Sequence, residues 1–120
     1  MEIVCISFKI LLFIKNHYCV TSKVREVTQL FPKDELFGLN TQFKRASDSI
    51  VLNIAEGAGN SFDKEFARFL DYSIRSAIEC MGCTDIALTN KYVDKELHDN
   101  LYKQINELVA MLYSLQKKYK

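Results

Sequence analysis

Apolar residues recur along most of the chain at alternating steps of three and four positions, which is the spacing of one face of an α-helix. The most regular stripe lies in the last quarter of the chain and consists of Leu97, Leu101, Ile105, Leu108, Leu112, Leu115 and Tyr119. No stretch alternates apolar and polar residues as a half-buried strand does. The pattern therefore predicts an all-α protein.

Breaks in this pattern divide the chain into four predicted helices. Pro32 ends the first, because proline lacks the N–H that a helix interior needs. Gly57 and Gly59 suit the left-handed turn that closes a helix. We expect helices over residues 8–31, 40–57, 61–89 and 94–118, the last three capped by Asn40, by Asn60 or Ser61, and by Asp94. Their short links favour a single domain, residues 1–120, folded as an antiparallel up-down-up-down four-helix bundle.

Composition and charge favour an ordinary globular protein over a nucleic-acid binder, a secreted protein or a membrane protein. The chain has 120 residues, of which 48% are hydrophobic and 26% charged, as in an ordinary globular protein. A formal net charge of +1 is far below the basic excess typical of dedicated nucleic-acid binders. Residues 1–14 are apolar, but their start is acidic and Lys9 interrupts them, so they predict neither a signal peptide nor a membrane span. We expect a cytoplasmic protein without a membrane partner.

Four cysteines raise the question of thiol or metal chemistry. Cys80 and Cys83 form a C-x-x-C, but it lies in the middle of a predicted helix rather than at a helix start after a strand. A zinc site needs about four ligands, and the other candidates are scattered at Cys5, Cys19, His17 and His98. We expect buried free thiols with no metal and no cofactor. A thiol or metal protein that uses Cys80 and Cys83 is the alternative.

Polar groups stand out between Ser49 and Asn60, where Asn53 and Glu56 lie one turn apart among apolar positions. A carboxylate on an apolar face is costly to bury unless it is paired. Arginines on the second and third predicted helices are candidate partners, because a guanidinium binds a carboxylate with two hydrogen bonds. We predict a structural polar lock between these helices, made of Asn53, Glu56, Arg45 and Arg68. An anion or RNA site is the alternative.

The candidate nucleic-acid contacts are Lys44, Arg45, Lys64, Arg68 and Arg75. Acidic residues are interleaved with them along the second and third predicted helices, so a mixed, solvated face is the simpler interpretation. A groove that follows phosphates would instead bind RNA in a strongly salt-dependent way.

No pattern of catalytic residues accompanies these features. The two histidines form no Ser–His–Asp arrangement, and no glycine-rich phosphate loop follows a strand. We expect no catalytic residue, no enzymatic activity and no small-molecule substrate.

Several segments between Phe31 and Leu70 carry a family resemblance. They are Phe31-Pro32-Lys33-Asp34-Glu35-Leu36-Phe37-Gly38-Leu39, Gln42-Phe43-Lys44-Arg45-Ala46, Ser49-Ile50, Asn53-Ile54-Ala55-Glu56-Gly57 and Lys64-Glu65-Phe66-Ala67-Arg68-Phe69-Leu70. In this order and spacing they resemble the bacterial four-helix bundle family, also called the ribosomal RNA intervening-sequence protein family. Some members are encoded in insertions within large-subunit ribosomal RNA genes. The accessory protein of diversity-generating retroelements is a related branch.

The resemblance implies a homopentameric ring of helical bundles with no established enzymatic activity. The retroelement branch binds nucleic acid and a reverse transcriptase through a strongly basic ring, and this chain lacks that basic excess. The tryptophan usual in the family's first helix is replaced by Ile14, and the usual proline of the second helix by Val51 or Leu52. Together these features predict a self-assembling scaffold or adaptor, with RNA or a nucleic-acid-processing protein as a candidate partner. A nucleic-acid-binding accessory protein is the alternative.

Overall fold

The computed structural model describes residues 20–59 and 62–120. Within these two ranges every regular element is helical and no strand is present. The elements are a helical segment over residues 20–28, the short 3₁₀ helix η1 (Lys33–Glu35), and the helices α2 (Leu39–Ala58), α3 (Asp63–Thr89) and α4 (Lys95–Lys117). Residues 1–14, and the predicted start of the first helix, lie outside the described ranges.

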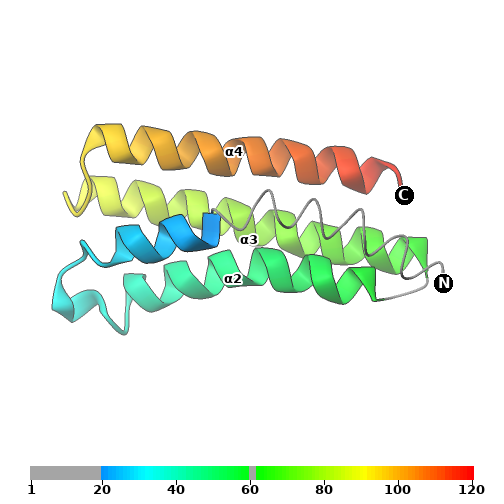
Figure 1. The fold of residues 1–120 in the computed structure, drawn as a ribbon, viewed down its shortest axis with the longest axis horizontal. Coiled ribbons are helices and arrows are strands. Elements are labelled where there is room, and N and C mark those ends of the chain that lie inside the picture. Colours follow the sequence, from blue (N-terminus) through cyan, green and yellow to red (C-terminus); the bar gives the residue numbers. More distant parts are fainter. Residues whose placement is uncertain (1–19, 60–61) are drawn as a thin grey trace.

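Successive helices run in opposite directions, with α3 between α2 and α4 (Figure 1). The segment 20–28 lies along the first half of α2 (Figure 1). The fold is therefore all-α, with four helical segments in the order of an up-down-up-down four-helix bundle, as predicted. Assembly into a ring remains a prediction. Across the described ranges, no helix is long and apolar enough to cross a membrane.

The core consists of the apolar stripes of the four helical segments. In α4 the predicted stripe is buried at Leu101, Ile105, Leu108 and Leu112, each at most 1% exposed. Its first and last positions are only partly buried. Other large side chains at the centre of the core are Val24, Phe43, Ile50, Ile54, Leu70 and Ile74. The period of three and four therefore identified the buried face of α4 correctly.

A buried glutamine outside that stripe also joins α4 to α3. Gln116 is 4% exposed, and its Nε2 donates a 2.9 Å hydrogen bond to the carbonyl of Ala67. The bond satisfies an amide that would otherwise be costly to bury. It fixes the end of α4 against the first turns of α3.

α2 and α3 approach each other closely near the end of α2. Gly57 is a buried helical residue, and an ideal Cβ placed there would lie 2.7 Å from Cβ of Phe69 and 2.9 Å from Cδ1 of Phe66. The prediction that Gly57 and Gly59 form a left-handed turn is wrong, because α2 continues to Ala58 and Gly59 has a right-handed φ of −74°. Gly57 is there because α3 leaves no room for a side chain.

The start of α2 also differs from the prediction that Asn40 caps it. α2 begins at Leu39, after Gly38, so Asn40 lies inside the first turn. Its Nδ2 donates instead to the carbonyl of Thr28 at 3.1 Å. Asn40 therefore ties the end of segment 20–28 to α2. Its role was not visible in the sequence, because the partner belongs to another helix.

The turn from α3 into α4 contains a lysine in the left-handed conformation. Lys91 has a φ of 62°, and its N–H donates to the carbonyl of Leu88 at 3.0 Å. The next N–H, of Tyr92, donates to the carbonyl of Ala87 at 2.9 Å. This pair of bonds is the Schellman motif, in which glycine usually holds the position of Lys91.

The cap predicted for α4 is confirmed. Oδ1 of Asp94 accepts a 2.8 Å hydrogen bond from the N–H of Leu97. The caps predicted for α3, Asn60 or Ser61, lie outside the described residues. An N-cap was predictable at Asp94 because donor and acceptor are only three residues apart.

Candidate functional site

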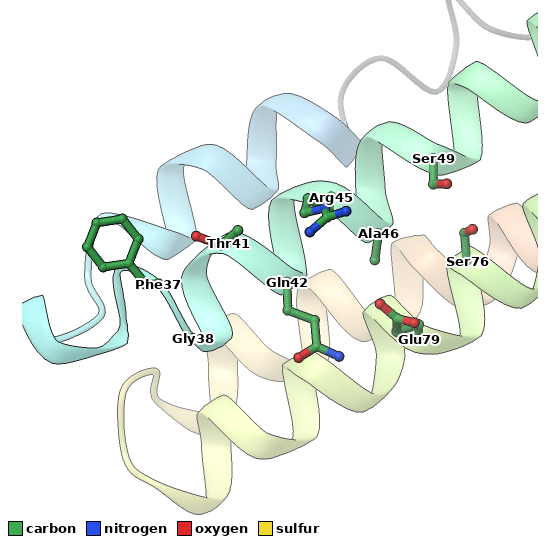
Figure 2. A pocket seen from close by; sticks show the side chains of 9 residues that line it. All are labelled: Phe37, Gly38, Thr41, Gln42, Arg45, Ala46, Ser49, Ser76 and Glu79. Atoms are coloured by element: carbon green, nitrogen blue, oxygen red, sulfur yellow. The ribbon is translucent and has the colours of Figure 1, made fainter.

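A groove lies on the surface between the first half of α2 and the second half of α3. Its volume is about 520 Å³, within the range of about 300–1,000 Å³ typical of small-ligand sites. We call it the α2–α3 groove and define it by Phe37, Gly38, Thr41, Gln42, Arg45, Ala46, Ser49, Ser76 and Glu79 (Figure 2).

The helical period aligns the side chains of the groove. Gln42, Arg45 and Ser49 follow each other at steps of three and four on α2, and Ser76 and Glu79 lie one step of three apart on α3. Figure 2 shows Gln42 and Ser49 directed from α2 toward α3 and Ser76 directed from α3 toward α2, with Glu79 on α3 one step further along the groove. The two serines are short, so the facing helices leave space between them.

Phe37 stands at the mouth of the groove and is 91% exposed. The backbone on both sides of it is fixed by hydrogen bonds. The N–H of Gly38 donates to the carbonyl of Glu35 at 3.0 Å, and the hydroxyl of Thr41 donates to the carbonyl of Leu36 at 2.5 Å. The loop therefore sets the direction in which Phe37 leaves the bundle.

Glu35 connects this loop to two other parts of the bundle. Its Oε1 lies 3.4 Å from the N–H of Leu39 at the start of α2, and its Oε2 accepts a 2.8 Å bond from the hydroxyl of Tyr92. That bond raises the pKa of Tyr92. The ring of Phe31 packs on the ring of Tyr92, with centroids 5.4 Å apart. These contacts join the connection before α2 to the connection between α3 and α4.

Arg45 is the arginine of the groove, and among the described residues it has no carboxylate partner. The other three arginines of the chain each form an ion pair: Arg25 with Asp48 at 2.8 Å, Arg68 with Glu65 at 2.5 Å and Arg75 with Asp71 at 3.1 Å. A guanidinium that is not paired internally has all its donors available to an external anion. Arg45 is therefore the arginine whose positive charge is not offset by a carboxylate of the described residues.

The five predicted nucleic-acid contacts do not form one basic face. Arg68 and Arg75 are bound to carboxylates of their own helix, which offsets their charge. Lys44 is half-buried on α2, and Lys64 is exposed in the first turn of α3, at the far end of that helix from the groove. Of the five, Arg45 alone lines the groove. Acidic residues one helical turn away neutralise the positive charge of α3.

The predicted polar lock of Asn53, Glu56, Arg45 and Arg68 is not assembled. Nδ2 of Asn53 donates within α2, to the carbonyl of Ser49 at 2.8 Å. Glu56 is exposed and forms no ion pair with any described residue. Arg68 is engaged on α3, and Arg45 lies in the groove. Close packing at Gly57 and a buried bond between α3 and α2 hold the helices together instead.

That buried bond joins Ser73 of α3 to Ile50 of α2. The hydroxyl of Ser73, which is fully buried, donates to the Ile50 carbonyl. It pairs a hydroxyl that would otherwise be buried without a partner, so removing it would be costly. A serine within an apolar stripe was the sequence signal for this contact.

A bidentate ion pair links segment 20–28 to α2. Nη1 and Nη2 of Arg25 lie 2.8 and 2.9 Å from Oδ1 and Oδ2 of Asp48. The guanidinium holds the pKa of Asp48 below its usual value of 3.8. Both side chains are more than a third exposed, so solvent screening limits the pair to about 0.2–1 kcal/mol of stability. Sequence reasoning missed this contact, because its partners lie 23 positions apart.

His98 forms another contact between helices that the sequence did not reveal. Its Nε2 lies 2.7 Å from Oδ1 of Asp85 on α3, and its Nδ1 lies 2.8 Å from Oδ1 of Asp99 on α4. The ring also stacks on Tyr102, with centroids 5.3 Å apart. The hydrogen bond to Asp85 is the main cause that raises the pKa of His98, and Asp99 adds to it. The charged imidazolium can therefore connect the two helices.

Cys80 and Cys83 are free and buried, at 0% and 3% exposure. Burial raises the pKa of both thiols, that of Cys83 to about 11. A thiolate is the reactive and metal-binding form of cysteine, so this environment disfavours thiol chemistry. Among the residues that the structure describes, no group of three or more His, Cys, Asp or Glu side chains is arranged to hold a metal ion. Cys5 and Cys19 lie outside those residues.

The described helices place the protein in the class of up-down-up-down four-helix proteins, with a polar groove between its second and third helices. The chain belongs to the 23S rRNA-intervening sequence protein family, whose profile matches residues 11–114. This result confirms the family that the segments between Phe31 and Leu70 resemble.

The fold is shared with a solved structure. The crystal structure of a protein with unknown function from the S23 ribosomal protein family of Bacteroides thetaiotaomicron VPI-5482 superposes with a TM-score of 0.74. The alignment covers 98% of this chain and 99% of that chain at 19% sequence identity, so the likeness is one of fold. No curated protein matches the chain.

Proposed function

We propose that the protein is a non-enzymatic helical scaffold or adaptor that assembles with copies of itself in the cytoplasm. The observation that supports this proposal is a set of exposed apolar side chains on α2 and α3. We call it the exposed apolar set; it comprises Leu52 (64% exposed), Tyr72 (37%), Ile78 (50%) and Ile86 (49%). Single exposed apolar residues are ordinary, whereas a contiguous apolar patch is typical of a protein–protein contact. The proposal takes the exposed apolar set as the source of such a patch.

The family resemblance supplies the expected number of copies, which is five in a ring. In a ring, each copy contacts its two neighbours head to tail, so it uses one surface for one neighbour and a different surface for the other. The exposed apolar set would provide one of the two surfaces. Burying it would remove apolar area from water, which is the main driving force of protein association.

Light scattering on the full chain tests the proposal. We expect a mass several times that of the 13.9 kDa chain, and five times if the resemblance holds. The double variant Leu52→Asp/Ile78→Asp should lower the mass, because a carboxylate in an apolar contact is costly to desolvate. Gln104→Asp, at an exposed position of α4, is the control and should leave the mass unchanged.

Two results would contradict the proposal: one would exclude self-assembly, and the other would exclude the exposed apolar set as the contact surface. A 13.9 kDa monomer for the unaltered chain would exclude self-assembly. An assembled double variant with the same mass as the unaltered chain would show that the exposed apolar set is not the contact surface.

A further inference from the structure

We propose that the α2–α3 groove is the surface on which α4 of a neighbouring copy docks. The inference rests on the proposed self-assembly, and it names the second surface that a head-to-tail contact requires. We call this second surface the outer stripe of α4. It consists of exposed residues at steps of four and three, namely Lys103, Glu107, Ala110, Ser114 and Lys117. The occupant of the groove is therefore a helix of the same chain.

The groove belongs to a longer surface that runs along α2 and α3. On α2, Leu52 lies seven positions after Arg45, and on α3, Tyr72 lies seven positions before Glu79. Because α2 and α3 are antiparallel, both steps lead the same way along the bundle (Figure 1). At 1.5 Å per residue each step covers about 10.5 Å. The surface therefore has a charged band at Arg45 and Glu79 and an apolar band at Leu52 and Tyr72.

The outer stripe of α4 has the same order and the same spacing. Its charged residues are Lys103 and Glu107, and Ala110 lies seven positions after Lys103. Tyr113, one turn beyond Ala110, is 47% exposed. α4 runs in the same direction as α2 (Figure 1), so its charged residues also precede its apolar ones. A second α4 laid parallel to α2 along the groove thus brings charged residues to the charged band and apolar residues to the apolar band.

Hydrogen bonds between α3 and α4 show which of their residues are level along the bundle. These bonds join His98 to Asp85 and Gln116 to Ala67. Equal numbers of residues separate the two bonds on both helices, so Glu79 is level with residue 104 of α4 and Tyr72 with residue 111. Rotation about a ring axis parallel to the bundle leaves every residue at its own height. The bands of one copy are then at the heights of the matching residues on the α4 of its neighbour.

The charges of the two surfaces complement each other. None of Arg45, Glu79, Lys103 and Glu107 forms an ion pair with a described residue. A docked α4 offers Glu107 to Arg45 and Lys103 to Glu79, so both charges of the groove gain a partner. Complementary charges at a contact select the partner and fix its register. The burial of apolar area supplies the driving force.

Short side chains give a helix room to approach the groove. Ser49 and Ser76 line the groove beyond Arg45 and Glu79, in the direction of the apolar band. Ala110 and Ser114 on the outer stripe of α4 are equally short. Packed helices lie with their axes about 8–10 Å apart, which requires such small or interdigitating side chains at the contact.

Charge reversal tests the pairing of Arg45 with Glu107. In light scattering over a dilution series of the full chain, Arg45→Glu and Glu107→Arg should each raise the concentration at which assemblies dissociate at least about tenfold, because like charges then face each other. The double variant Arg45→Glu/Glu107→Arg should recover the assembly. So should a mixture of the two single variants, because each altered surface then meets the other altered surface. Glu26→Arg, at an exposed position of segment 20–28, is the matched control and should change dissociation less than about twofold.

The pair of Glu79 and Lys103 gives an independent test. Glu79→Lys and Lys103→Glu should each weaken assembly, and their combination should restore it. Circular dichroism should show folded helices in every variant, since all the altered side chains are exposed.

The outcomes separate this inference from the scaffold proposal. A monomeric unaltered chain would overturn both. An unaltered chain that assembles, but whose dissociation is unchanged by the reversals, would overturn the docking of α4 alone. So would single reversals that weaken assembly without recovery in the double variants and in the mixture, because the altered charges would then not face each other across the contact.

Discussion

Replacing Gly57 by alanine would add one methyl group where α2 and α3 lie closest. The ideal Cβ would lie 2.7 Å from Cβ of Phe69, closer than real Cβ contacts come, so a backbone shift is required. The nearer partner is the root of a side chain rather than its flexible end. The backbones of the two helices must therefore move apart at this point.

The size of the effect follows from two opposing terms. Alanine is favoured over glycine in a helix interior by about 0.8–1 kcal/mol, whereas forcing an extra methyl into a packed contact costs about 1–3 kcal/mol. We therefore expect Gly57→Ala to change the free energy of unfolding by between about zero and a loss of 2 kcal/mol. Gly82 on α3 is the matched control, because nothing lies within 4 Å of its ideal Cβ. Gly82→Ala should thus gain up to about 1 kcal/mol.

The difference between the two variants isolates the packing term, because both gain the same helix propensity. Urea unfolding followed by circular dichroism gives each free energy by linear extrapolation. All three proteins should be compared at one concentration at which light scattering shows the same mass. We expect Gly57→Ala to be about 1–3 kcal/mol less stable than Gly82→Ala. Equal stability would refute the close approach of α2 and α3 at this point.

Three further predictions concern single side chains. Lys91→Gly should raise the free energy of unfolding by about 1 kcal/mol, because a left-handed residue with a Cβ costs about 1–2 kcal/mol and glycine does not; a lower melting temperature would contradict this. His98 should make stability depend on pH: its folded pKa is raised, so its contribution is complete below its ordinary pKa of 6.5 and is lost as the pH rises through the higher folded value. His98→Gln should flatten that fall in urea titrations above pH 6.5, and parallel curves for the two proteins would count against the contact. Cys80 and Cys83 should react with a thiol reagent only after unfolding, because burial raises both pKa values, and prompt labelling of the native protein would show that the thiols are accessible.

α4 shows which features were predictable from the sequence. Its buried stripe recurs at steps of three and four, and its cap joins two residues three positions apart, so both signals are local. The prediction of the polar lock was wrong for a reason that lies within α2 itself. A helix turns by about 100° per residue, so Glu56 lies about 200° around α2 from the buried Ile54 and faces solvent. A spacing of one turn from Asn53 did not place Glu56 in the core.

The partners in contacts between helices were not predictable, because they depend on how the packed helices are rotated. Arg25 and Asp48 lie 23 positions apart, and the close approach at Gly57 is decided by a phenylalanine of the next helix. The residues of the α2–α3 groove were likewise only partly predictable from the sequence. Arg45 was identified as a candidate, since basic residues can be read directly. Glu79 was not, because only the packed structure places it on the opposite wall.

Local opening of the bundle is constrained at the end where Glu35 lies. One carboxylate contacts the first turn of α2 and the residue that follows the turn out of α3, so neither connection can move away without breaking a bond to the other. Native-state hydrogen exchange should therefore detect the start of α2 and the α3–α4 connection as one cooperative unit. Replacing Glu35 by glutamine should divide that unit, so that the amide of Tyr92 exchanges faster than amides in the middle of α3. A partly buried glutamate at the end of η1 would in this way decide the order in which the helices come apart.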